Sequence, residues 1–376
     1  MNATKLFFSA TALAIITVFF TLTSKNVYSP PIITGSKNLL SKCELINLKG
    51  AVGPESIAFD INGDGPYTGV ADGRIIKWNG HEQGWVDFAV TSSHRYIYIS
   101  VLIYLSGFKF EHICGRPLGL RFDTRTGDLY IADAYLGLQV VGPSGGLATR
   151  LVTEVEGQPL RFTNDLDIDE QEDVIYFTDT STQFQRRQFV ASVVSGDKTG
   201  RLMKYDKSTK AVTVLLRGLA FANGVSLSKD KSFVLVAETS TGRIVRYWLK
   251  GPHAGKHDTF ADLTGYPDNI RRNSKGKFWV ALHSKRSLLS KLVTSNSWLG
   301  KTALKLPVSI QQLHFMLVGW QAHATAIKLS EDGQVLEVLE DVQSKTLKFI
   351  SEVEEKNGKL WIGSVMVPFV GVYELS

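Results

Sequence analysis

Cysteine is scarce in this sequence, and so are clusters of basic residues. The 376 residues include only Cys43 and Cys114, so at most one disulfide can form, and the sequence leaves open whether the two are bonded or free. Lys and Arg outnumber Asp and Glu by 42 to 36, but they are spread along the chain, with no basic block beside aromatic residues. Nothing therefore indicates a nucleic-acid partner.

The sequence also lacks a long uninterrupted apolar segment. The best candidate, Leu6 to Leu22, follows Lys5 and is too short and too rich in Ser and Thr for a typical membrane-spanning helix. We predict a secretory signal peptide in residues 1–24, with a retained anchor as the alternative, and contact with a membrane only in the anchor case. Residues 25–50, which include SPPII, are expected to form a linker and lead-in. The protein would then enter the secretory pathway, with the vacuole, the endoplasmic reticulum or the extracellular space as its destination.

What the sequence does contain is a repeat within a globular composition of 44% hydrophobic and 21% charged residues. Six times, a six-residue strand pattern is followed by a turn rich in Gly, Asp or Lys and then by a second apolar strand. The first strands are ESIAFD (55–60), LGLRFD (118–123), NDLDID (164–169), NGVSLS (223–228), DNIRRN (268–273) and, more weakly, SEVEEK (351–356). The second strands end in TGVAD, LYIAD, IYFTD, VLVAE, WVALH and LWIGS.

The spacing within these units is regular. The first residue of the first strand and the last residue of the second are 15 positions apart in the four middle units, 17 in the first and 13 in the last. Apolar residues alternate along the strands, which argues against helices. Six strand-turn-strand units predict an all-β fold, a six-bladed β-propeller over residues 51–376. Helices are expected in two poorly matched inserts, near 92–112 and at about 284–322, the second forming a short helical cap.

The first position of each unit tends to carry a side-chain oxygen. In order, these positions are Glu55, Leu118, Asn164, Asn223, Asp268 and Ser351. Each heads an inner strand beside the central channel, so the side chains would converge from separate blades. Carboxylate and carboxamide oxygens without nitrogen or sulfur suit a hard divalent cation, with Ca²⁺ preferred over Mg²⁺. The predicted metal ligands are Glu55, Asn164, Asn223, Asp268 and Asn269, with Asp165 as a further partner; the alternative is that Asn and Asp only punctuate turns.

A second set of polar residues ends the second strands. It comprises Asp72, Asp133, Asp179, Glu238, His283 and Ser364. An antiparallel strand returns to the face where its partner begins, so these residues should line the channel at the same face as the first set, together with Leu118 and Ser351. His283 is the candidate general base, and His112 competes for that role. The alternative is a histidine that only hydrogen-bonds a loop.

These stretches resemble plant strictosidine synthase-like proteins. The matching segments include GPESIAFD, HICGRPLGLRFD, RFTNDLDID, LLRGLAFANGVSLS and KLWIGS, and they extend from about Val52 to Tyr373. The resemblance places the chain in a wider six-bladed group that includes paraoxonases and the gluconolactonase and regucalcin hydrolases. Two different activities follow from it as expectations.

The first activity is that of strictosidine synthase, which condenses tryptamine with the aldehyde secologanin in a Pictet–Spengler reaction. Its essential glutamate heads the sixth inner strand, and alignment through NGKLWIG puts Ser351 there, with Phe349 and Ile350 in place of its His-Phe pair. A serine cannot replace that carboxylate as acid and base near neutral pH. Glu352 comes next, but strand alternation would point its side chain away from the channel. Condensation is therefore the alternative and not the leading prediction.

The second activity is hydrolysis. The resemblance to paraoxonase-like enzymes implies a catalytic calcium held by Glu, Asn and Asp residues at the heads of inner strands, a pattern that the predicted ligands match. The cation would polarise an ester or lactone carbonyl while Asp268, His283 or His112 assists an attacking water. We therefore predict a calcium-dependent hydrolase whose partner is a small-molecule ester or lactone substrate. A propeller that binds without catalysis is the third hypothesis.

Two segments depart from the proteins that the chain resembles. Residues 93–113 are apolar where such proteins carry a polar loop, and the second cysteine that bonds the counterpart of Cys114 is missing here. This stretch is either a lid at the channel mouth or the product of an altered exon. Residues 284–323 are apolar and basic, and they interrupt the repeat before the last blade. They form either a cap that shapes the substrate site or a structural brace.

Overall fold

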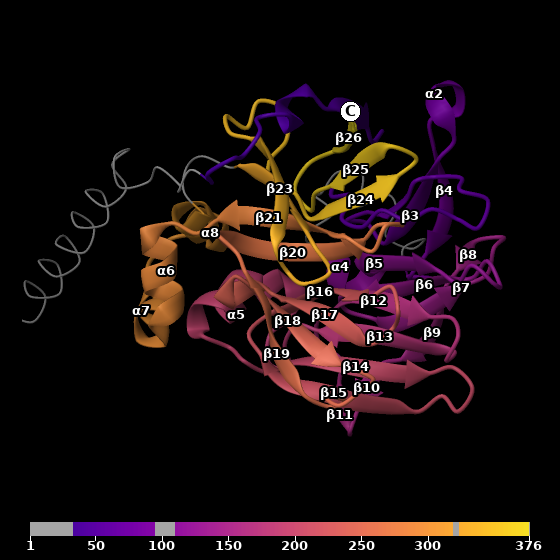
Figure 1. Ribbon diagram of the computed structural model, residues 1–376, viewed down its shortest axis with the longest axis horizontal. Coiled ribbons are helices and arrows are strands. Elements are labelled where there is room, and N and C mark those ends of the chain that lie inside the picture. Colours follow the sequence, from indigo (N-terminus) through magenta and orange to yellow (C-terminus); the bar gives the residue numbers. More distant parts are fainter. Residues whose placement is uncertain (1–32, 95–109, 319–322, 376) are drawn as a thin grey trace, which may run out of the picture.

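Six four-stranded sheets form the blades of a β-propeller, which confirms the predicted fold class. The structure is a computed structural model that describes residues 33–94, 110–318 and 323–375. The predicted signal peptide or anchor and residues 95–109 of the apolar segment lie outside the described residues. In Figure 1 the blades succeed one another in sequence order, and the strands of the last blade lie beside the N-terminal segment.

The blades take their strands mostly from consecutive segments. Blade 1 contains β2 (Tyr67–Gly69), β3 (Arg74–Trp78), β4 (Trp85–Val90) and the parallel strand β8 (Gly146–Leu147), and blade 2 contains β5 (Pro117–Phe122), β6 (Leu129–Asp133), β7 (Gly137–Val141) and β9 (Thr149–Val152). Blade 3 contains β12 (Thr163–Asp169), β13 (Val174–Asp179), β14 (Gly200–Asp206) and β15 (Val212–Leu219), and blade 4 contains β16 (Ala222–Leu227), β17 (Phe233–Glu238), β18 (Arg243–Trp248) and β19 (His257–Asp262). Blade 5 contains β20 (Gly265–Arg272), β21 (Phe278–Lys285), β22 (Ala324–Leu329) and β23 (Val335–Asp341). Blade 6 contains β24 (Glu352–Lys356), β25 (Lys359–Gly363), β26 (Phe369–Glu374) and β1 (Glu44–Asn47), and a separate hairpin joins β10 (Glu154–Val155) to β11 (Gln158–Pro159).

The two ends of the described chain close the ring together. Strand β1 pairs antiparallel with β26, so that Glu44 lies opposite Val372 and Asn47 opposite Phe369. The range 25–50, predicted as linker and lead-in, therefore contains the outer strand of blade 6. The first predicted strand, 55–60, is also less regular than expected, because it forms only an isolated bridge between Ala58 and Tyr67.

The core lies between neighbouring blades. Each sheet is covered on both faces, so β13 and β17 are buried along their whole length. One inter-blade cluster, shared by blades 4 and 5, includes Phe233, Phe260, Ile270, Phe278, Leu282 and Ile327. Burial of each such side chain contributes about 1.5–3 kcal/mol. Burial on both faces explains why the second strands of the repeat are apolar almost without interruption.

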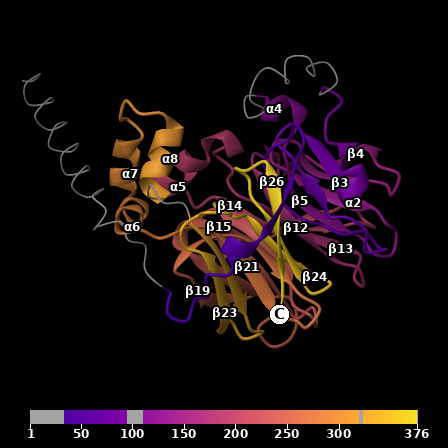
Figure 2. The same ribbon diagram turned by 90° about the horizontal axis from the view of Figure 1, so that it is seen from above.

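Helices gather over one face of the propeller (Figure 2). Helices α6 (Leu288–Ser295), α7 (Ser297–Ala303) and α8 (Ile310–Val318) lie in the predicted insert between β21 and β22, and α5 (Phe189–Ser195), which the sequence did not predict, lies between β13 and β14. A small apolar core of Val190, Val194, Val293, Leu313 and Leu317 joins them. The inner strands begin at this face, so the four helices form a cap over the channel mouth.

The remaining helices are short. They are η1 (Leu40–Lys42), α2 (Gly80–Gln83), α4 (Glu111–Cys114), η3 (Arg186–Gln188) and η4 (Thr239–Thr241). Helix α4 lies at the end of the first predicted helical insert, 92–112. Among the described residues, no helix is both long and apolar enough to cross a membrane.

Candidate metal centre

Bulges shape the starts of four inner strands. The strand register shifts between Pro117 and Gly119 in β5, between Thr163 and Leu166 in β12, between Ala222 and Val225 in β16, and between Pro267 and Ile270 in β20. A bulge bends its strand and re-aims the side chains within it. The residues inside these bulges include the predicted positions Leu118, Asn164, Asn223 and Asp268. Simple alternation therefore does not govern side-chain direction at the channel mouth.

Glycines let these bulged strands approach one another. A Cβ atom on Gly224 of β16 would lie 2.5 Å from the Cα of Asn269, and one on Gly119 of β5 would lie 2.6 Å from the Cα of Asp165. Any other residue would push the neighbouring inner strand away. The glycine in the motif ANGVSL thus holds the backbone of Asn269 against β16.

Several side-chain oxygens in this region are buried without a hydrogen-bond partner in the described structure, and three of them stand out. They belong to Glu55 (Oε2), Asn164 (Oδ1) and Asn223 (Oδ1). The two amide nitrogens are engaged: Asn164 donates to Thr180 Oγ1 at 2.9 Å, and Asn223 donates to Asp268 Oδ1 at 2.7 Å. Because only the amide nitrogen is used, the lone pairs of each amide oxygen remain available to a ligand. Buried oxygens are seldom left unsatisfied, so the arrangement fits a group that accepts oxygen ligands.

The two carboxyl groups of the set are poorly suited to stay ionised without a cation. Burial raises the pKa of Glu55 well above its usual value, and the nearby Asp268 raises it further. Burial also raises the pKa of Asp268 to about 7, although the hydrogen bond from Asn223 opposes this. A bound divalent cation would reverse both shifts by stabilising the charged forms.

The predicted ligands fit a hard cation such as calcium. Among the described residues, no three side chains of the His, Cys, Asp and Glu types cluster as a metal site; the set here instead combines two carboxylates with the carboxamides of Asn164 and Asn223. Calcium accepts such neutral oxygens readily. Asn269 is 1% exposed, and neither of its amide atoms has a hydrogen-bond partner in the described structure, so it is available as a further ligand.

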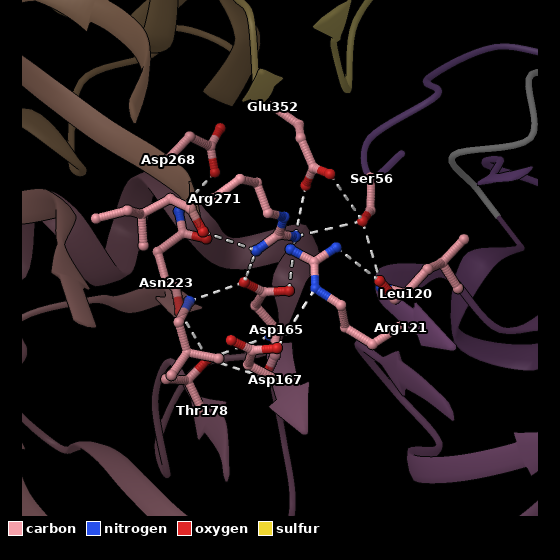
Figure 3. Close-up of polar contacts among 12 residues, drawn as sticks. Ser56, Leu120, Arg121, Asp165, Asp167, Thr178, Asn223, Asp268, Arg271 and Glu352 are labelled. Atoms are coloured by element: carbon pink, nitrogen blue, oxygen red, sulfur yellow. Dashed lines mark hydrogen bonds and ion pairs between the residues drawn. The ribbon is translucent and has the colours of Figure 1, made fainter. Parts of the chain in front are cut away.

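An arginine occupies the layer directly below. Arg271 lies between Asp165 and Glu352 (Figure 3), with distances of 2.9 Å from Nη2 to Asp165 Oδ1 and 2.5 Å from Nη2 to Glu352 Oε2. All three side chains are at most 1% exposed. Asp165 also accepts from the backbone of Val225 at 2.8 Å. Asp165, predicted as a further metal partner, is therefore paired with a guanidinium, which is the internal cation of this layer.

The prediction that Glu352 points away from the channel is wrong. Its side chain is fully buried, and Oε1 accepts from the backbone N–H of Ile57 at 2.9 Å. Strand β24 begins only at Glu352, so alternation counted from Ser351 is no guide to its direction. Ser351 itself donates its hydroxyl to the backbone oxygen of Glu55 at 2.8 Å.

His283 and a histidine from the cap meet beside the candidate metal ligands. His283 Nε2 lies 3.1 Å from Nε2 of His314 in α8, and His283 Nδ1 lies 3.7 Å from Asp268 Oδ2. Burial lowers the pKa of His283 to about 3, with a further contribution from His314, and burial lowers the pKa of His314 to about 4. Both rings are therefore neutral near pH 7. No sequence signal pointed to His314, because it is contributed by an insert outside the repeat.

The other predicted channel residues mostly fix loops. Three of the carboxylates accept from backbone N–H groups: Asp133 from Tyr135 and Leu136, Asp179 from Phe162, and Glu238 from Ala220. Asp179 also accepts from Arg201, and Asp72 pairs with Arg74. Ser364 donates to the carbonyl of Phe349, and Leu118 packs with Phe162 and Phe221. A carboxylate that accepts from a loop N–H holds the backbone in place. These contacts leave His283 as the member of the second set that lies against a predicted ligand.

Charged residues that the sequence did not single out border the Glu55 side of the centre. Arg186 binds Glu111 at 2.9 Å and 2.6 Å, and Arg116 lies 3.6 Å from the same carboxylate. Burial and the neighbouring Arg186 lower the pKa of Arg116 to about 10. His112, the competing candidate base, is exposed on α4 with its ring against that of Tyr135, at 6.5 Å between centroids.

The sequence left the state of the two cysteines open. Cys43 is a free buried thiol whose pKa is raised to about 12 by burial. The bond between Cys43 and Cys114 is therefore not formed.

Together, the six blades and the oxygen-rich group at one end of the channel define a six-bladed propeller with a central polar site. Family models described as "Strictosidine synthase" and "Strictosidine synthase-like, N-terminal" match residues 164–252 and 38–78. Strictosidine synthase-like 10 of Arabidopsis thaliana is 63% identical over 96% of this chain and 99% of its own length, and strictosidine synthase-like 3 is 54% identical over 90% and 86%. The chain belongs to the strictosidine synthase-like family.

Solved structures agree on the fold. A gluconolactonase from Xanthomonas campestris superposes with a TM-score of 0.56 at 16% identity, covering 93% of this chain and 95% of that one. The calcium-binding protein regucalcin from Agrobacterium tumefaciens gives a TM-score of 0.55 at 12% identity, covering 87% and 94%. At these identities, the likeness extends to the propeller fold alone.

Proposed function

We propose that this protein is a calcium-dependent hydrolase of a small ester or lactone. The observation that carries the proposal is the group of buried, unpartnered oxygens on Glu55, Asn164 and Asn223, next to the carboxyl group of Asp268. Burying such oxygens without a partner costs about 1–3 kcal/mol each. A bound cation would offset that cost.

Each side chain would have a definite part. Glu55, Asn164, Asn223 and Asp268 would hold calcium, which when bound supplies a Lewis acid that polarises a carbonyl. Because its pKa is low, His283 is a neutral imidazole near pH 7, so it can accept a hydrogen bond from water on one nitrogen while the other donates. His314 fixes the orientation of that ring through the contact between their Nε2 atoms.

The surroundings favour a substrate with an apolar part. Phe349 stacks on His283 at 5.3 Å between ring centroids, Phe315 lies 6.1 Å from Phe349, and Phe189 of α5 lies 5.3 Å from His314. Such a wall would bind an alkyl or aryl group and exclude water. The names of two structural neighbours, a gluconolactonase and a calcium-binding regucalcin, support this choice of reaction and metal.

A synthase-type condensation is the second candidate, because one carboxylate of blade 6 does lie at the centre. However, the carboxylate of Glu352 is paired with Arg271 at 2.5 Å and accepts from Ile57 N. These contacts engage both oxygens of the carboxylate with partners inside the protein. Ser351, at the position that aligns with the synthase glutamate, has no acidic group.

Metal analysis combined with an activity panel tests the proposal. The full chain would be freed of metal with chelator, reloaded with calcium, and assayed on an aryl ester, a simple lactone and a mixture of an arylethylamine and an aldehyde. We expect one calcium per chain and ester or lactone turnover that requires it. Condensation of the amine with the aldehyde would favour the synthase reaction instead. A loss of heat stability on chelation without any turnover would favour a binding protein.

A further inference from the structure

A polar cavity lies at the far end of the inner strands from the candidate metal centre. It has a volume of about 200 Å³, and its polar lining comprises Arg121, Asp167, Ser226, Arg272, Glu354 and Lys356. These residues lie on β5, β12, β16, β20 and β24, and those on β12, β16 and β20 follow the candidate metal ligands of the same strand. The pairing of Arg271 with Asp165 and Glu352 occupies the layer between the two sites.

The positive charges of this cavity are only partly balanced. Arg121 is shared between Asp167 at 3.7 Å and Glu354 at 3.9 Å. Arg272 uses its Nε to donate to the carbonyl of Leu227 at 2.9 Å. Across the parts of the chain that the structure describes, neither Arg272 nor Lys356 has a carboxylate partner within 4.0 Å. Two cations that line a cavity without a carboxylate partner indicate a site for an anion.

The two acidic side chains of the cavity, Asp167 and Glu354, do not fully neutralise its three positive charges. Asp167 already accepts from the backbone N–H groups of Leu227 and Ile168, at 2.8 Å and 2.9 Å. Burial raises the pKa of Glu354 to about 7, against the opposing effect of Arg121. Near neutral pH the carboxyl group of Glu354 therefore carries only part of a negative charge. The cavity as a whole is positive.

A buried hydroxyl provides an independent observation. The side chain of Ser226 is 1% exposed, lines the cavity, and has no hydrogen-bond partner for its Oγ in the described structure. A hydroxyl buried without a partner is costly. An oxygen atom of a bound anion would accept from it.

We propose that this cavity binds a small oxyanion, either phosphate or a compact carboxylate. Arg272 and Lys356 neutralise the ligand, and Ser226 donates a hydrogen bond to it. Its volume accommodates a phosphate group or a carboxylate of a few carbon atoms. The site is separate from the candidate metal centre, so binding does not require calcium.

Calorimetric titration of the full chain with inorganic phosphate and, separately, with succinate tests the proposal. Both titrations are run with chelator present and at constant ionic strength, so that neither calcium nor bulk screening contributes. We expect one of the two anions to bind with a dissociation constant of about 1 mM or lower. The arm that binds identifies the ligand chemistry. A folded protein that binds neither anion overturns the proposal.

Variants locate the binding. Arg272→Gln and Lys356→Met should each weaken it about tenfold or more, because each removes a charge that contacts the ligand. Lys359→Met is the matched control, since Lys359 lies on the next strand and pairs with Glu374 at 2.9 Å outside the cavity. If anion affinity falls equally in the control, the loss is due to the change in net charge, and the proposed site is wrong.

Two further variants test the role of the hydroxyl and the independence of the two sites. Ser226→Ala should weaken binding of the anion. It should not lower the stability of the anion-free protein, because the hydroxyl has no hydrogen-bond partner in the described structure to lose. An unchanged affinity would exclude Ser226 from the site. Asn223→Ala, in the candidate metal centre, should leave anion binding intact. Failure of the proposed hydrolase activity would therefore not count against the anion site, and the reverse also holds.

Discussion

The Nε2 atoms of His283 and His314 lie 3.1 Å apart, although one residue lies in β21 of blade 5 and the other belongs to the helical cap. Both rings are neutral near pH 7 because burial lowers the pKa of each. One nitrogen of the pair must donate and the other accept. The contact therefore couples the position of α8 to the orientation of the candidate base.

Replacing His314 by Phe should separate this coupling from cap packing. Phenylalanine keeps the aromatic contacts to Phe189 and Phe349 but removes the nitrogen that faces His283. We expect kcat/KM for the ester or lactone substrate to fall about 10- to 100-fold, as for the loss of a group that supports acid–base catalysis, with calcium content unchanged. Steady-state kinetics and metal analysis measure both quantities. Phe315→Leu, which alters the same aromatic wall without a hydrogen bond, should change KM more than kcat; equal effects of the two variants would show that His314 acts only through packing.

Asn223→Ala should remove calcium. Its Oδ1 is one of the buried, unpartnered oxygens, and its Nδ2 holds Asp268 at 2.7 Å, so the variant loses a ligand and the orientation of another. We expect calcium affinity to fall about 100-fold, a loss of about 2.7 kcal/mol, measured by titration of the metal-free protein. Asn273→Ala is the control, because Asn273 is also buried but bonds Glu355 away from the metal centre. Unchanged calcium stoichiometry and affinity in Asn223→Ala would mean that these oxygens are not a metal site.

Arg271→Met should destabilise the propeller severely. It leaves the buried carboxylates of Asp165 and Glu352 without their cation, and breaking a buried pair in this way costs about 3–5 kcal/mol. Chemical denaturation measures the change in the free energy of unfolding. Neutralising both acids in the same chain, with Asp165→Asn and Glu352→Gln, should recover most of the loss.

A matched surface-side pair provides the reference for that measurement. Arg217 contacts Glu156, and both side chains are 56% exposed, so Arg217→Met should cost less than about 1 kcal/mol. A similarly small cost for Arg271→Met would show that the central layer is open to water. In that case the pairing with Arg271 would no longer argue against a role for Glu352 in the synthase reaction.

The positions of the blades could be predicted from the sequence repeat. Each propeller sheet is buried on both faces, so every unit requires the same apolar strand pattern. The outer strand β1 could not be located in this way, because the four residues ELIN carry little pattern and their partner β26 lies more than 300 positions away in the sequence. Pairing between the two ends of a chain leaves no local signal. The ring-closing strand is therefore visible only in the structure.

Side-chain direction at the mouth is harder to predict than strand position. Side chains do not simply alternate between the two faces of a strand at the bulges that contain Asn164, Asn223 and Asp268. Alternation also fails to predict the direction of Glu352, because β24 starts one residue after Ser351. Residue type alone still groups the candidate metal ligands, because oxygen donors at equivalent positions of separate blades converge. His314 cannot be found in this way, since the cap follows no repeat.

Glu354 should make the stability of the protein depend on pH. Burial raises the pKa of its folded state to about 7 from an ordinary value of 4.5. Between these values the folded state binds more protons than the unfolded state, so stability falls as the pH rises through this window. The destabilisation is complete above pH 7 and absent below pH 4.5.

Glu354→Gln removes the titrating group while keeping its shape, so the variant should unfold less readily than the wild type at high pH. We expect a gap of about 1–2 kcal/mol at pH 8, which is less than the full shift implies because the side chain is 20% exposed. Urea denaturation at pH 4.5, 6 and 8 measures the gap, which should close at pH 4.5. Glu374→Gln, at an exposed carboxylate on β26, should show no such trend. A gap of the same size at all three pH values would mean that Glu354 contributes through packing or through its contact with Arg121, and that its carboxyl group is already ionised well below pH 7.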